Sequence, residues 1–404
     1  MVTTRTPLPQ APTAPGRWLF PVGLFLAVSA VLVVVVWQTG VQLPRWQGAG
    51  PPGRNIPGGR LTEGWVRWDA GWYLLIAQKG YSYVPGSQSP VAFFPAYPLA
   101  LRVVAGLIGS TFLAGMAVTW ASGLGVAVLF WRWCCAHMAT RSAQTALVLL
   151  LVFPYAWFLH LSVYADALFI VAVLASFTLL DHGHPVLAGV AAAVATGARP
   201  IGIALVIGLV VRALERRGAL RLPETGWLRL PNGIHLERVR PADAGVLLSL
   251  TGLGAWCTYL WVRFGDPLAF AAVQAAPGWE QTAGPRTWLK VAFVGELLHG
   301  PRLVALRLFV QALLTLGALV LVPLVARRFG WGYAAFTLAV VALPAISTKD
   351  FQGMGRYLLA AFPCFAVAGE WLAARPRLRV GVVAVSGLGL IFLTSMSAQG
   401  YYLT

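Results

Sequence analysis

The chain has 404 residues, of which 58% are hydrophobic and only 11% carry a charge. Soluble domains carry about 25% charged residues, so the composition excludes an ordinary soluble protein and predicts an all-α polytopic membrane protein. The net charge of +17 is spread over short loops between apolar runs. Positive charge in such loops is typical of the cytoplasmic side of a membrane protein, where it contacts anionic lipid headgroups. We therefore expect the lipid bilayer as a partner and no binding of nucleic acid.

Hydropathy divides the chain into a cytoplasmic tail, 1–17, and a single transmembrane domain, 18–404. The run 18–37 is longer than a signal-peptide core, and we expect it to be a retained signal anchor. Each further apolar run of roughly 20 residues predicts a crossing of the bilayer. The eleven predicted helices are 18–38, 111–135, 143–160, 163–181, 185–198, 201–215, 244–263, 303–326, 331–347, 357–374 and 380–397.

Two stretches fit this pattern less well. The run Leu99–Ile108 is too short to cross and is predicted to be re-entrant or interfacial. The helices predicted on either side of Arg199–Pro200 are each shorter than a full crossing, so a broken hairpin is an alternative there. Irregular backbone at membrane depth is tolerated when it is buried or lines a cavity.

The distribution of Lys and Arg among the loops predicts the orientation. It places the N-terminus and the basic loop 216–243 in the cytoplasm. The long first loop 39–95, which we expect to carry short amphipathic helices, then lies outside together with the loop 264–302. The turns 162–166 and 347–356 fall on the same face. Together with the Arg-rich composition, this suggests an integral protein of a bacterial plasma membrane.

The segment RWDAGWYLLIAQKGY, Arg67–Tyr81, places one carboxylate, Asp69, among tryptophans at the predicted membrane boundary. In a helix Asp69 and Tyr73 lie on one stripe, with Trp68 and Trp72 beside it. An interfacial aromatic belt accounts for the aromatic residues. It does not account for the acid, because a carboxylate is costly to desolvate at such a place.

Further ionisable residues lie within apolar spans or at turns on the same predicted face. Asp166 and Arg199 form either a structural ion pair or part of a functional cavity. Lys349 and Arg356 allow two interpretations. They lie in a solvated loop and extend their charged ends to the membrane interface, or they bind the oxygens of a phosphate.

No pattern of ligands indicates a cofactor. The four cysteines lie in apolar runs and the histidines are scattered, so we predict neither a disulfide framework nor a metal site. A divalent ion shared by Asp69 and Asp166 is possible but unsupported. The chain has no GxGxxG, P-loop or GxSxG motif, which leaves a nucleotide site and a serine nucleophile without support.

Arg67–Tyr81 followed by AFFPAYP, Ala92–Pro98, resembles the first-loop signature of GPI mannosyltransferase II, the PIG-V family of GT-C glycosyltransferases, and its prokaryotic relatives. SVYADALF, Ser162–Phe169, is similar to a Ser-x-Tyr-x-Glu-x-Leu-Phe stretch of that family. TGARPIG, Thr196–Gly202, keeps the Arg and the Gly of an Arg-x-Asn-Gly element, and GRYLLAAFP, Gly355–Pro363, matches a late Arg-Tyr motif. Trp72 stands where the eukaryotic enzymes tend to have His.

The resemblance implies a GT-C fold and a mannosyltransferase that takes a hexose from a polyprenyl-phosphate sugar. The acceptor is a hydroxyl on a glycolipid or glycan, and a protein hydroxyl is left open. A single inverting displacement needs one base and a stabilised leaving group. The predicted catalytic acids are Asp69 and Asp166, and the predicted phosphate ligands are Arg199, Arg356 and Lys349. The predicted substrate contacts are Arg67, Trp68, Trp72, Tyr73, Tyr164 and Tyr357.

Two other classes of protein would use the same features. A lipid-linked-sugar flippase or other transporter also needs buried charges and a cavity open to lipid. A scaffold subunit of a cell-envelope complex would tolerate neutral residues at the charged positions. The chain has no convincing internal repeat, which weakens the transporter interpretation.

Overall fold

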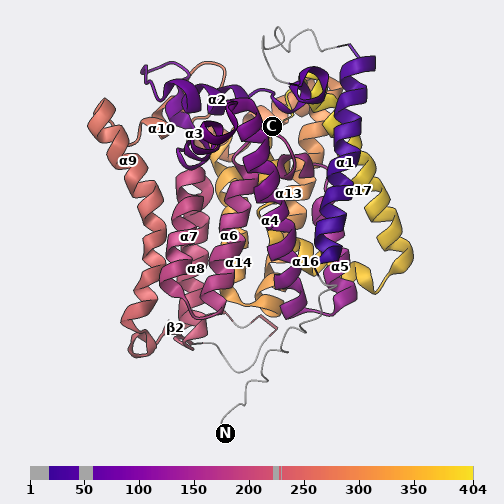
Figure 1. Ribbon diagram of the computed structural model, residues 1–404. Coiled ribbons are helices and arrows are strands. Elements are labelled where there is room, and N and C mark those ends of the chain that lie inside the picture. Colours follow the sequence, from indigo (N-terminus) through magenta and orange to yellow (C-terminus); the bar gives the residue numbers. More distant parts are fainter. Residues whose placement is uncertain (1–17, 45–57, 222–226, 229, 404) are drawn as a thin grey trace.

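The computed structural model describes residues 18–44, 58–221, 227, 228 and 230–403. Long helices lie side by side and form a bundle, and short helices and loops cross one end of it (Figure 1). The α-helices are α1 (Leu19–Gln42), α2 (Ala70–Lys79), α3 (Ala96–Ile108), α4 (Thr111–His137), α5 (Thr140–Leu151), α6 (Asp166–Asp181), α7 (Pro185–Ala198), α8 (Ile203–Arg216), α9 (Leu250–Phe264), α10 (Ala269–Ala272), α11 (Pro285–Trp288), α12 (Val291–His299), α13 (Arg302–Phe329), α14 (Trp331–Ser347), α15 (Met354–Leu358), α16 (Phe362–Ala373) and α17 (Pro376–Gln399).

Short 3₁₀ helices and one small strand pair complete the secondary structure. The 3₁₀ helices are η3 (Gly59–Leu61), η4 (Glu63–Trp65), η5 (Pro90–Ala92), η6 (Ala156–Leu159), η7 (Pro200–Gly202), η8 (Leu236–Arg238), η9 (Pro241–Ser249) and η10 (Val273–Ala275). Strands β1 (Leu220–Arg221) and β2 (Gly233–Ile234) pair antiparallel, with Leu220 opposite Ile234. We did not predict this hairpin, because two-residue strands leave no alternating pattern in a sequence.

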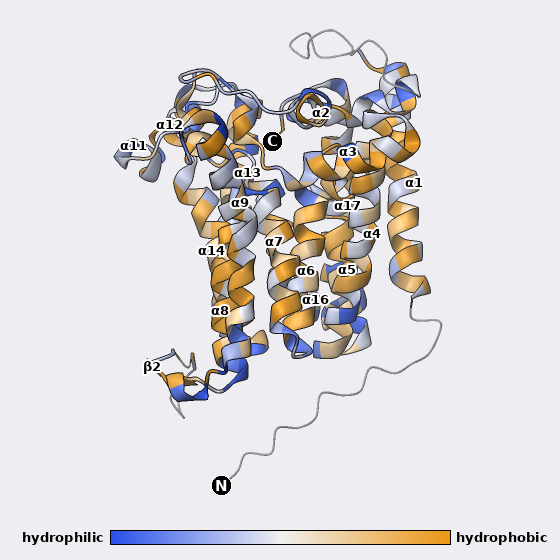
Figure 2. Ribbon diagram, turned by 60° about the vertical axis from the view of Figure 1, so that its left-hand side comes forward, coloured by the Kyte–Doolittle hydropathy of each residue, from blue (hydrophilic) through white to orange (hydrophobic). Residues whose placement is uncertain are grey.

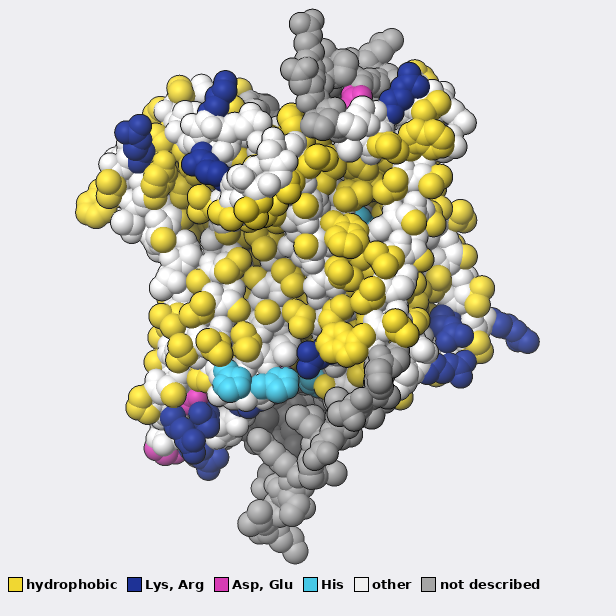
Figure 3. All heavy atoms as spheres, viewed as in Figure 1, with side chains coloured by type: hydrophobic (Ala, Val, Ile, Leu, Met, Phe, Trp, Pro, Cys, Tyr) yellow, Lys and Arg dark blue, Asp and Glu magenta, His cyan; other side chains and the backbone are white. Residues whose placement is uncertain are grey.

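The prediction of an all-α polytopic membrane protein is confirmed. Within the described residues, five helices are long and apolar enough to cross a membrane: α1, α4, α13, α17 and the continuous η9–α9 segment. Each of the other predicted spans overlaps a shorter helix of the bundle. Hydrophobic residues fill the middle of the bundle and hydrophilic residues gather at its two ends (Figure 2). The surface shows the same band between two zones of Lys and Arg (Figure 3).

Aromatic rings pack the centre of the bundle. Phe362 on α16 contacts Phe130 on α4, Phe177 on α6 and Phe336 on α14 at centroid distances of 6.1, 6.1 and 6.0 Å. Small residues bring backbones together where rings do not fit. A Cβ on Gly123 of α4 would lie 1.6 Å from the carbonyl oxygen of Leu159, so this crossing requires glycine.

Several helix boundaries differ from the prediction. The predicted span 143–160 ends as a helix at Leu151, because Pro154 follows it and cannot continue the hydrogen-bond ladder. The predicted span 357–374 is divided into α15 and α16 just before Pro363. The tail 1–17 and parts of the loops 39–95 and 216–243 lie outside the described residues.

The helices α7 and α8 are separated at Arg199–Pro200, as the broken-hairpin alternative required. Each has 14 residues and is therefore about 21 Å long. The hydrocarbon core is about 30 Å thick. Each of the two helices is therefore shorter than the hydrocarbon core is thick, so the two helices and the turn between them, η7, match the geometry of a broken hairpin. This turn forms part of the floor of the cavity described next.

Candidate active site

A cavity of about 390 Å³ opens at one end of the bundle. This end carries α2, α3 and α10, which are labelled in Figure 1. The walls of the cavity come from six parts of the chain: the start of α2, the segment around η5, the turn between α7 and α8, the loop after α9, the turn from α14 to α15, and the segment after α17. The lining residues are Asp69, Tyr73, Ala92, Phe93, Phe94, Ala198, Arg199, Pro200, Gln274, Gly278, Trp279, Gln281, Thr348, Lys349, Asp350, Gln352, Gly353, Arg356, Tyr357 and Tyr402. The segments predicted to share one face therefore meet at one end of the bundle.

Asp69 is held at the wall of this cavity by the start of α2. Its carbonyl oxygen accepts the first helical hydrogen bonds, from the amides of Trp72 and Tyr73. Its carboxylate does not cap the helix and remains directed to other partners. The preceding residue, Trp68, has φ +52°, a left-handed conformation that is strained for a side chain of this size. Such strain costs about 1–3 kcal/mol and typically persists where it positions a functional group.

Four charged groups alternate in sign along the cavity wall and directly behind it. Arg356 Nη1 lies 3.3 Å from Asp69 Oδ2, and Arg356 Nε lies 3.8 Å from Asp166 Oδ1. Asp166 in turn forms an ion pair with Arg199. The Asp166 side chain is 2% exposed and that of Asp69 is 19% exposed. Asp69 therefore faces the cavity, whereas Asp166 lies behind the two arginines.

Aromatic rings hold the two guanidinium groups in place. The Arg199 guanidinium carbon lies 4.7 Å from the centre of the Tyr357 ring. The Arg356 guanidinium carbon lies 5.4 Å from the ring of Tyr164 and 5.5 Å from that of Phe158. Contacts of this kind favour the cation when it is removed from water. Both arginines thus keep a fixed position and a positive charge at the floor of the cavity.

The loop after α9 supplies an aromatic wall. Trp279 from this loop packs edge-on against Phe93 and Trp72, at centroid distances of 6.1 and 6.0 Å. Trp72 and Phe93 stack on each other at 5.8 Å. Gln281 lies next to this wall, and its side-chain oxygen accepts a hydrogen bond from the amide of Lys349. Aromatic faces next to primary amides are suited to a ligand with both apolar and hydroxyl-bearing faces.

Ionic contacts fasten that loop to the turn after α14. The ammonium of Lys349 lies 2.8 Å from a carboxylate oxygen of Glu280, and this hydrogen bond lowers the pKa of the Glu280 carboxyl. Lys290 donates to the carbonyl of Thr348, and burial lowers the pKa of its ammonium. Glu280 and Lys290 both have left-handed backbones, with φ of +52° and +54°. Among the described residues these two and Trp68 are the non-glycine residues with positive φ.

Of the residues that the sequence singled out, six line the cavity: Asp69, Tyr73, Arg199, Lys349, Arg356 and Tyr357. The others lie around it. Asp166 and Tyr164 contact the arginines from behind. Arg67 donates two hydrogen bonds to the carbonyl of Ala398, at 3.1 and 2.7 Å. The Trp68 ring packs against Tyr402 at 4.8 Å, and Trp72 lies in the aromatic wall.

Sequence reasoning did not single out Trp279, Gln281 or Tyr402. The loop 264–302 was predicted to share the face of Asp69, which indicated where such residues would be found. Nothing in the spacing of the chain identifies which side chains of that loop turn inward. Tyr402 reaches the cavity because Arg307 on α13 donates a hydrogen bond to its carbonyl.

The two acids of the site share one cationic neighbour, Arg356. In the described part of the chain, no group of three or more His, Cys, Asp or Glu side chains gathers in a way that could hold an ion. Arg356 contacts both Asp69 and Asp166, so a cation shared by the two acids would meet a like charge.

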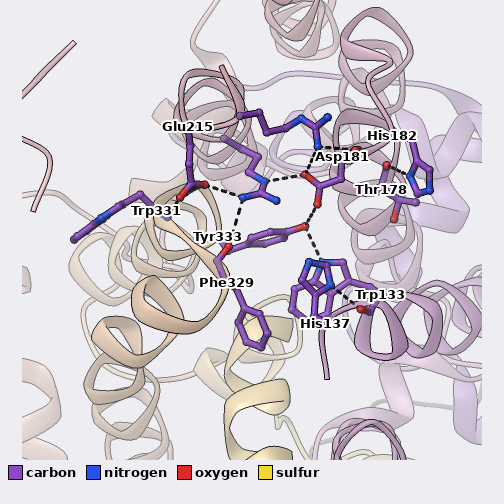
Figure 4. Close-up of polar contacts among 12 residues, drawn as sticks. Trp133, His137, Thr178, Asp181, His182, Glu215, Phe329, Trp331 and Tyr333 are labelled. Carbon is purple, nitrogen blue, oxygen red and sulfur yellow. Dashed lines mark hydrogen bonds and ion pairs between the residues drawn. The ribbon is translucent and has the colours of Figure 1, made fainter. Parts of the chain in front are cut away.

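A second polar cluster holds the opposite end of the bundle (Figure 4). Asp181 at the end of α6 accepts hydrogen bonds from Tyr333 at 2.6 Å and from Arg212 at 2.8 Å. Trp133 on α4 donates to the Tyr333 hydroxyl at 2.7 Å. Glu215 on α8 joins Arg212 to the start of α14. The cluster ties α4, α6, α8 and α14 together through groups that all have partners.

Comparison of the sequence with known proteins gives a partial match. No family model matches the chain. GPI alpha-1,6-mannosyltransferase 2 of Mus musculus is 31% identical over 171 residues, which are 40% of this chain and 33% of the relative. The same protein of Rattus norvegicus is 30% identical over 201 residues, 45% of this chain and 40% of the relative. The chain thus matches about a third to two fifths of the length of these curated relatives.

Comparison of the structure identifies the fold. ArnT from Cupriavidus metallidurans bound to undecaprenyl phosphate superposes with a TM-score of 0.50 at 16% identity, over 96% of this chain and 78% of ArnT. The apo form of the same enzyme also gives a TM-score of 0.50. ArnT is a GT-C glycosyltransferase. The chain therefore has the GT-C fold and resembles GPI mannosyltransferase II in part of its sequence, and both expectations are confirmed.

Proposed function

We propose that the protein is a membrane glycosyltransferase that moves a hexose, most simply mannose, from a polyprenyl-phosphate sugar to an acceptor hydroxyl. One observation carries the proposal: the cavity brings the Asp69 carboxylate together with the cations Arg199 and Arg356. This is the minimum set for a displacement that needs one base and a stabilised anionic leaving group. The likeness to GPI alpha-1,6-mannosyltransferase 2 supports mannose, and the undecaprenyl phosphate bound by ArnT supports a lipid-phosphate donor.

In the proposed reaction Asp69 is the base. The acceptor oxygen forms a bond to the anomeric carbon while its proton moves to an Asp69 carboxylate oxygen. The bond from the anomeric carbon to the phosphate oxygen breaks, and its electron pair leaves with the lipid phosphate. The acceptor attacks one face of the sugar ring and the phosphate leaves from the other, so the configuration at the anomeric carbon is inverted. A retaining mechanism needs a second carboxylate at the sugar, with the two groups about 5–5.5 Å apart. Asp166 is enclosed behind Arg199 and is not placed for that role.

Arg356 and Arg199 receive the departing phosphate. The contact of 3.3 Å between Arg356 and Asp69 is longer than the 2.7–2.9 Å typical of a charge-assisted hydrogen bond. A phosphate therefore competes readily for the same guanidinium and frees Asp69 to accept a proton. Arg199 remains fixed by Asp166 and Tyr357. In this scheme donor binding and activation of the base are one event.

The aromatic wall is the proposed place for a sugar ring. Trp279 and Phe93 present ring surfaces to the cavity, and Gln281 lies next to them with its amide. Sugar rings have faces of aliphatic hydrogens that pack on aromatic rings and edges of hydroxyls that bond to amides. We assign a glycolipid or glycan as the acceptor on this basis.

The cluster of Figure 4 favours a transferase over a flippase. A flippase must open towards both faces in turn, so the end remote from the cavity would have to separate. Here Asp181, Arg212 and Tyr333 join helices at that end through partnered, half-buried or buried groups.

We assign the cavity to the extracytoplasmic face of a bacterial plasma membrane, because the basic loops lie at the other end.

The test is transfer of radiolabelled mannose from polyprenyl-phosphate mannose by purified protein with a membrane-lipid extract. Asp69→Asn should lower turnover about 10²–10⁴-fold, the usual contribution of a general base. Asp266→Asn is the matched control, because Asp266 lies in the loop after α9 but does not line the cavity. Turnover of Asp69→Asn equal to that of Asp266→Asn in a folded sample would remove Asp69 from the role of base.

A further inference from the structure

A buried glutamine on α13, Gln311, lies behind the helix α15 that carries the cavity residues Arg356 and Tyr357. Gln311 has no exposed surface, although the helix around it is strongly apolar. A primary amide inside a membrane-spanning helix is costly and indicates a specific partner. Gln311 lies between Leu308 and Thr315 on the face of α13 that is buried in the bundle. The mechanism proposed above does not use this residue.

The partner of Gln311 is the backbone of α15, the five-residue helix that carries Arg356 and Tyr357. The amide of Gly355 donates to Gln311 Oε1 at 3.0 Å. The first amides of any helix lack partners within the helix itself. In α15 the amide of Met354 finds the carbonyl of Phe351, and those of Arg356 and Tyr357 find Gly353. Gln311 supplies the acceptor for the remaining amide from another helix.

This hydrogen bond is one of several contacts that hold α15 in place. A Cβ on Gly355 would lie 2.2 Å from the ring of Tyr155, so the helix is pressed against that ring on one side. Gln311 holds it from α13 on another. Arg307, one turn before Gln311 on α13, donates to the side chain of Gln352 just ahead of α15 at 3.0 Å. A rotation of α15 would move the Arg356 guanidinium away from Asp69 and from the cavity.

We propose that Gln311 is a positioning residue for the transfer reaction: by accepting the Gly355 amide it holds Arg356 where the leaving phosphate meets it. The inference rests on the proposed function, since Arg356 matters for transfer only if a phosphate departs there. It assigns the role to the oxygen of the Gln311 side chain. Its Nε2 is buried without a hydrogen-bond partner among the described residues and is not needed for the role.

The test removes the oxygen and keeps the size of the side chain. Gln311→Met should lower the turnover of transfer about tenfold, because an unpartnered buried amide favours other positions of α15. Gln311→Asn withdraws the oxygen by one carbon and should show the same loss. Thr315→Val is the matched control, because it also removes a buried polar group from this face of α13. The Thr315 hydroxyl donates to the backbone carbonyl of Gln311 in its own helix, and the proposed role does not need this contact. This variant should transfer at the wild-type rate.

A double-mutant cycle separates positioning from general destabilisation. In an Arg356→Lys background the further loss caused by Gln311→Met should shrink to less than about twofold, because the group being positioned is already changed. The inference would be overturned if Gln311→Met caused the same fold-loss of turnover in both backgrounds, or if both Gln311 variants kept wild-type turnover. Either result would leave the proposed function intact.

Binding of undecaprenyl phosphate provides a readout that needs no turnover. Gln311→Met should weaken its binding several-fold in the wild-type background and leave it unchanged beside Arg356→Lys. Equal weakening in both backgrounds, or none in either, would overturn the inference. A wild-type protein that binds this lipid phosphate yet transfers no sugar would instead count against the proposed function.

Discussion

Replacing Asp166 by Asn tests whether the buried ion pair is structural. The substitution keeps the shape and one acceptor oxygen of the side chain but removes its charge. Arg199 would then remain in a place where its side chain is 9% exposed, with no anion in contact. Arg356 would also lose its contact of 3.8 Å to the same carboxylate, although Asp69 would still hold it.

The magnitude follows from the burial of the pair. Two unit charges about 4 Å apart interact by about 4 kcal/mol at an effective dielectric constant of about 20. Removing one partner of a buried pair typically costs about 3–5 kcal/mol, because the other charge remains desolvated. The Asp69–Arg356 pair is longer and more exposed, so Asp69→Asn should cost about 1 kcal/mol or less. The two substitutions should therefore separate: Asp166→Asn mainly lowers stability, and Asp69→Asn mainly lowers turnover.

The assay uses the buried cysteines of the chain. Cys134 and Cys364 are buried, and a thiol-reactive dye reports their exposure as detergent-solubilised protein is heated. We expect Asp166→Asn to lower the midpoint by about 5 °C, because the shift per kcal/mol falls to about 1–2 °C in a chain of this size. The double variant Asp166→Asn with Arg199→Gln should recover most of that loss. A single variant as stable as the wild type would refute the reasoning that the pair is buried and structurally required.

Two further predictions concern packing and the sugar wall. Gly123→Ala should lower the midpoint in the same assay by more than Asp69→Asn does, because its Cβ would overlap the Leu159 carbonyl; Gly317→Ala on α13 meets no atom within 4 Å and should be neutral or stabilising. Trp279→Leu should raise the KM for one of the two substrates about tenfold with little change in the midpoint, since the ring is only half-buried and lines the cavity; unchanged KM for both donor and acceptor would remove the sugar from the aromatic wall.

The membrane architecture was predictable because it depends on composition and the length of apolar runs. The run 331–347 coincides with a helix, α14, because its one proline, Pro344, lies in the last turn, where the helix is about to end. The errors occur where a proline or a turn lies within an apolar run, as at Pro154, since hydropathy alone does not register the break. The pairing of β1 with β2 depends on a contact between segments that hydropathy does not describe.

The site was predictable to the extent that charge is expensive in a membrane. Asp69, Arg199 and Arg356 stood out because each needs a reason to be where it is, and the fold brings them to one cavity. Trp279 and Gln281 did not stand out, because an aromatic residue or an amide in a loop has no cost to explain. Gln311 carried a signal that sequence analysis passed over: it is a polar residue in the middle of an apolar helix, and it has the contact that such a residue requires.

The arrangement of the four charges separates a fixed pair from an exchangeable one. Asp166 and Arg199 are both enclosed, so their pairing is costly to break and keeps one cation at the floor of the cavity. Asp69 and Arg356 meet at 3.3 Å on the cavity side, where an incoming anion reaches the same guanidinium. Under the proposed function a lipid phosphate would replace Asp69 as the partner of Arg356, and the base would become available only when a sugar is in place to be transferred. Acceptor activation would then depend on the donor, without a moving domain, through competition between two anions for one arginine.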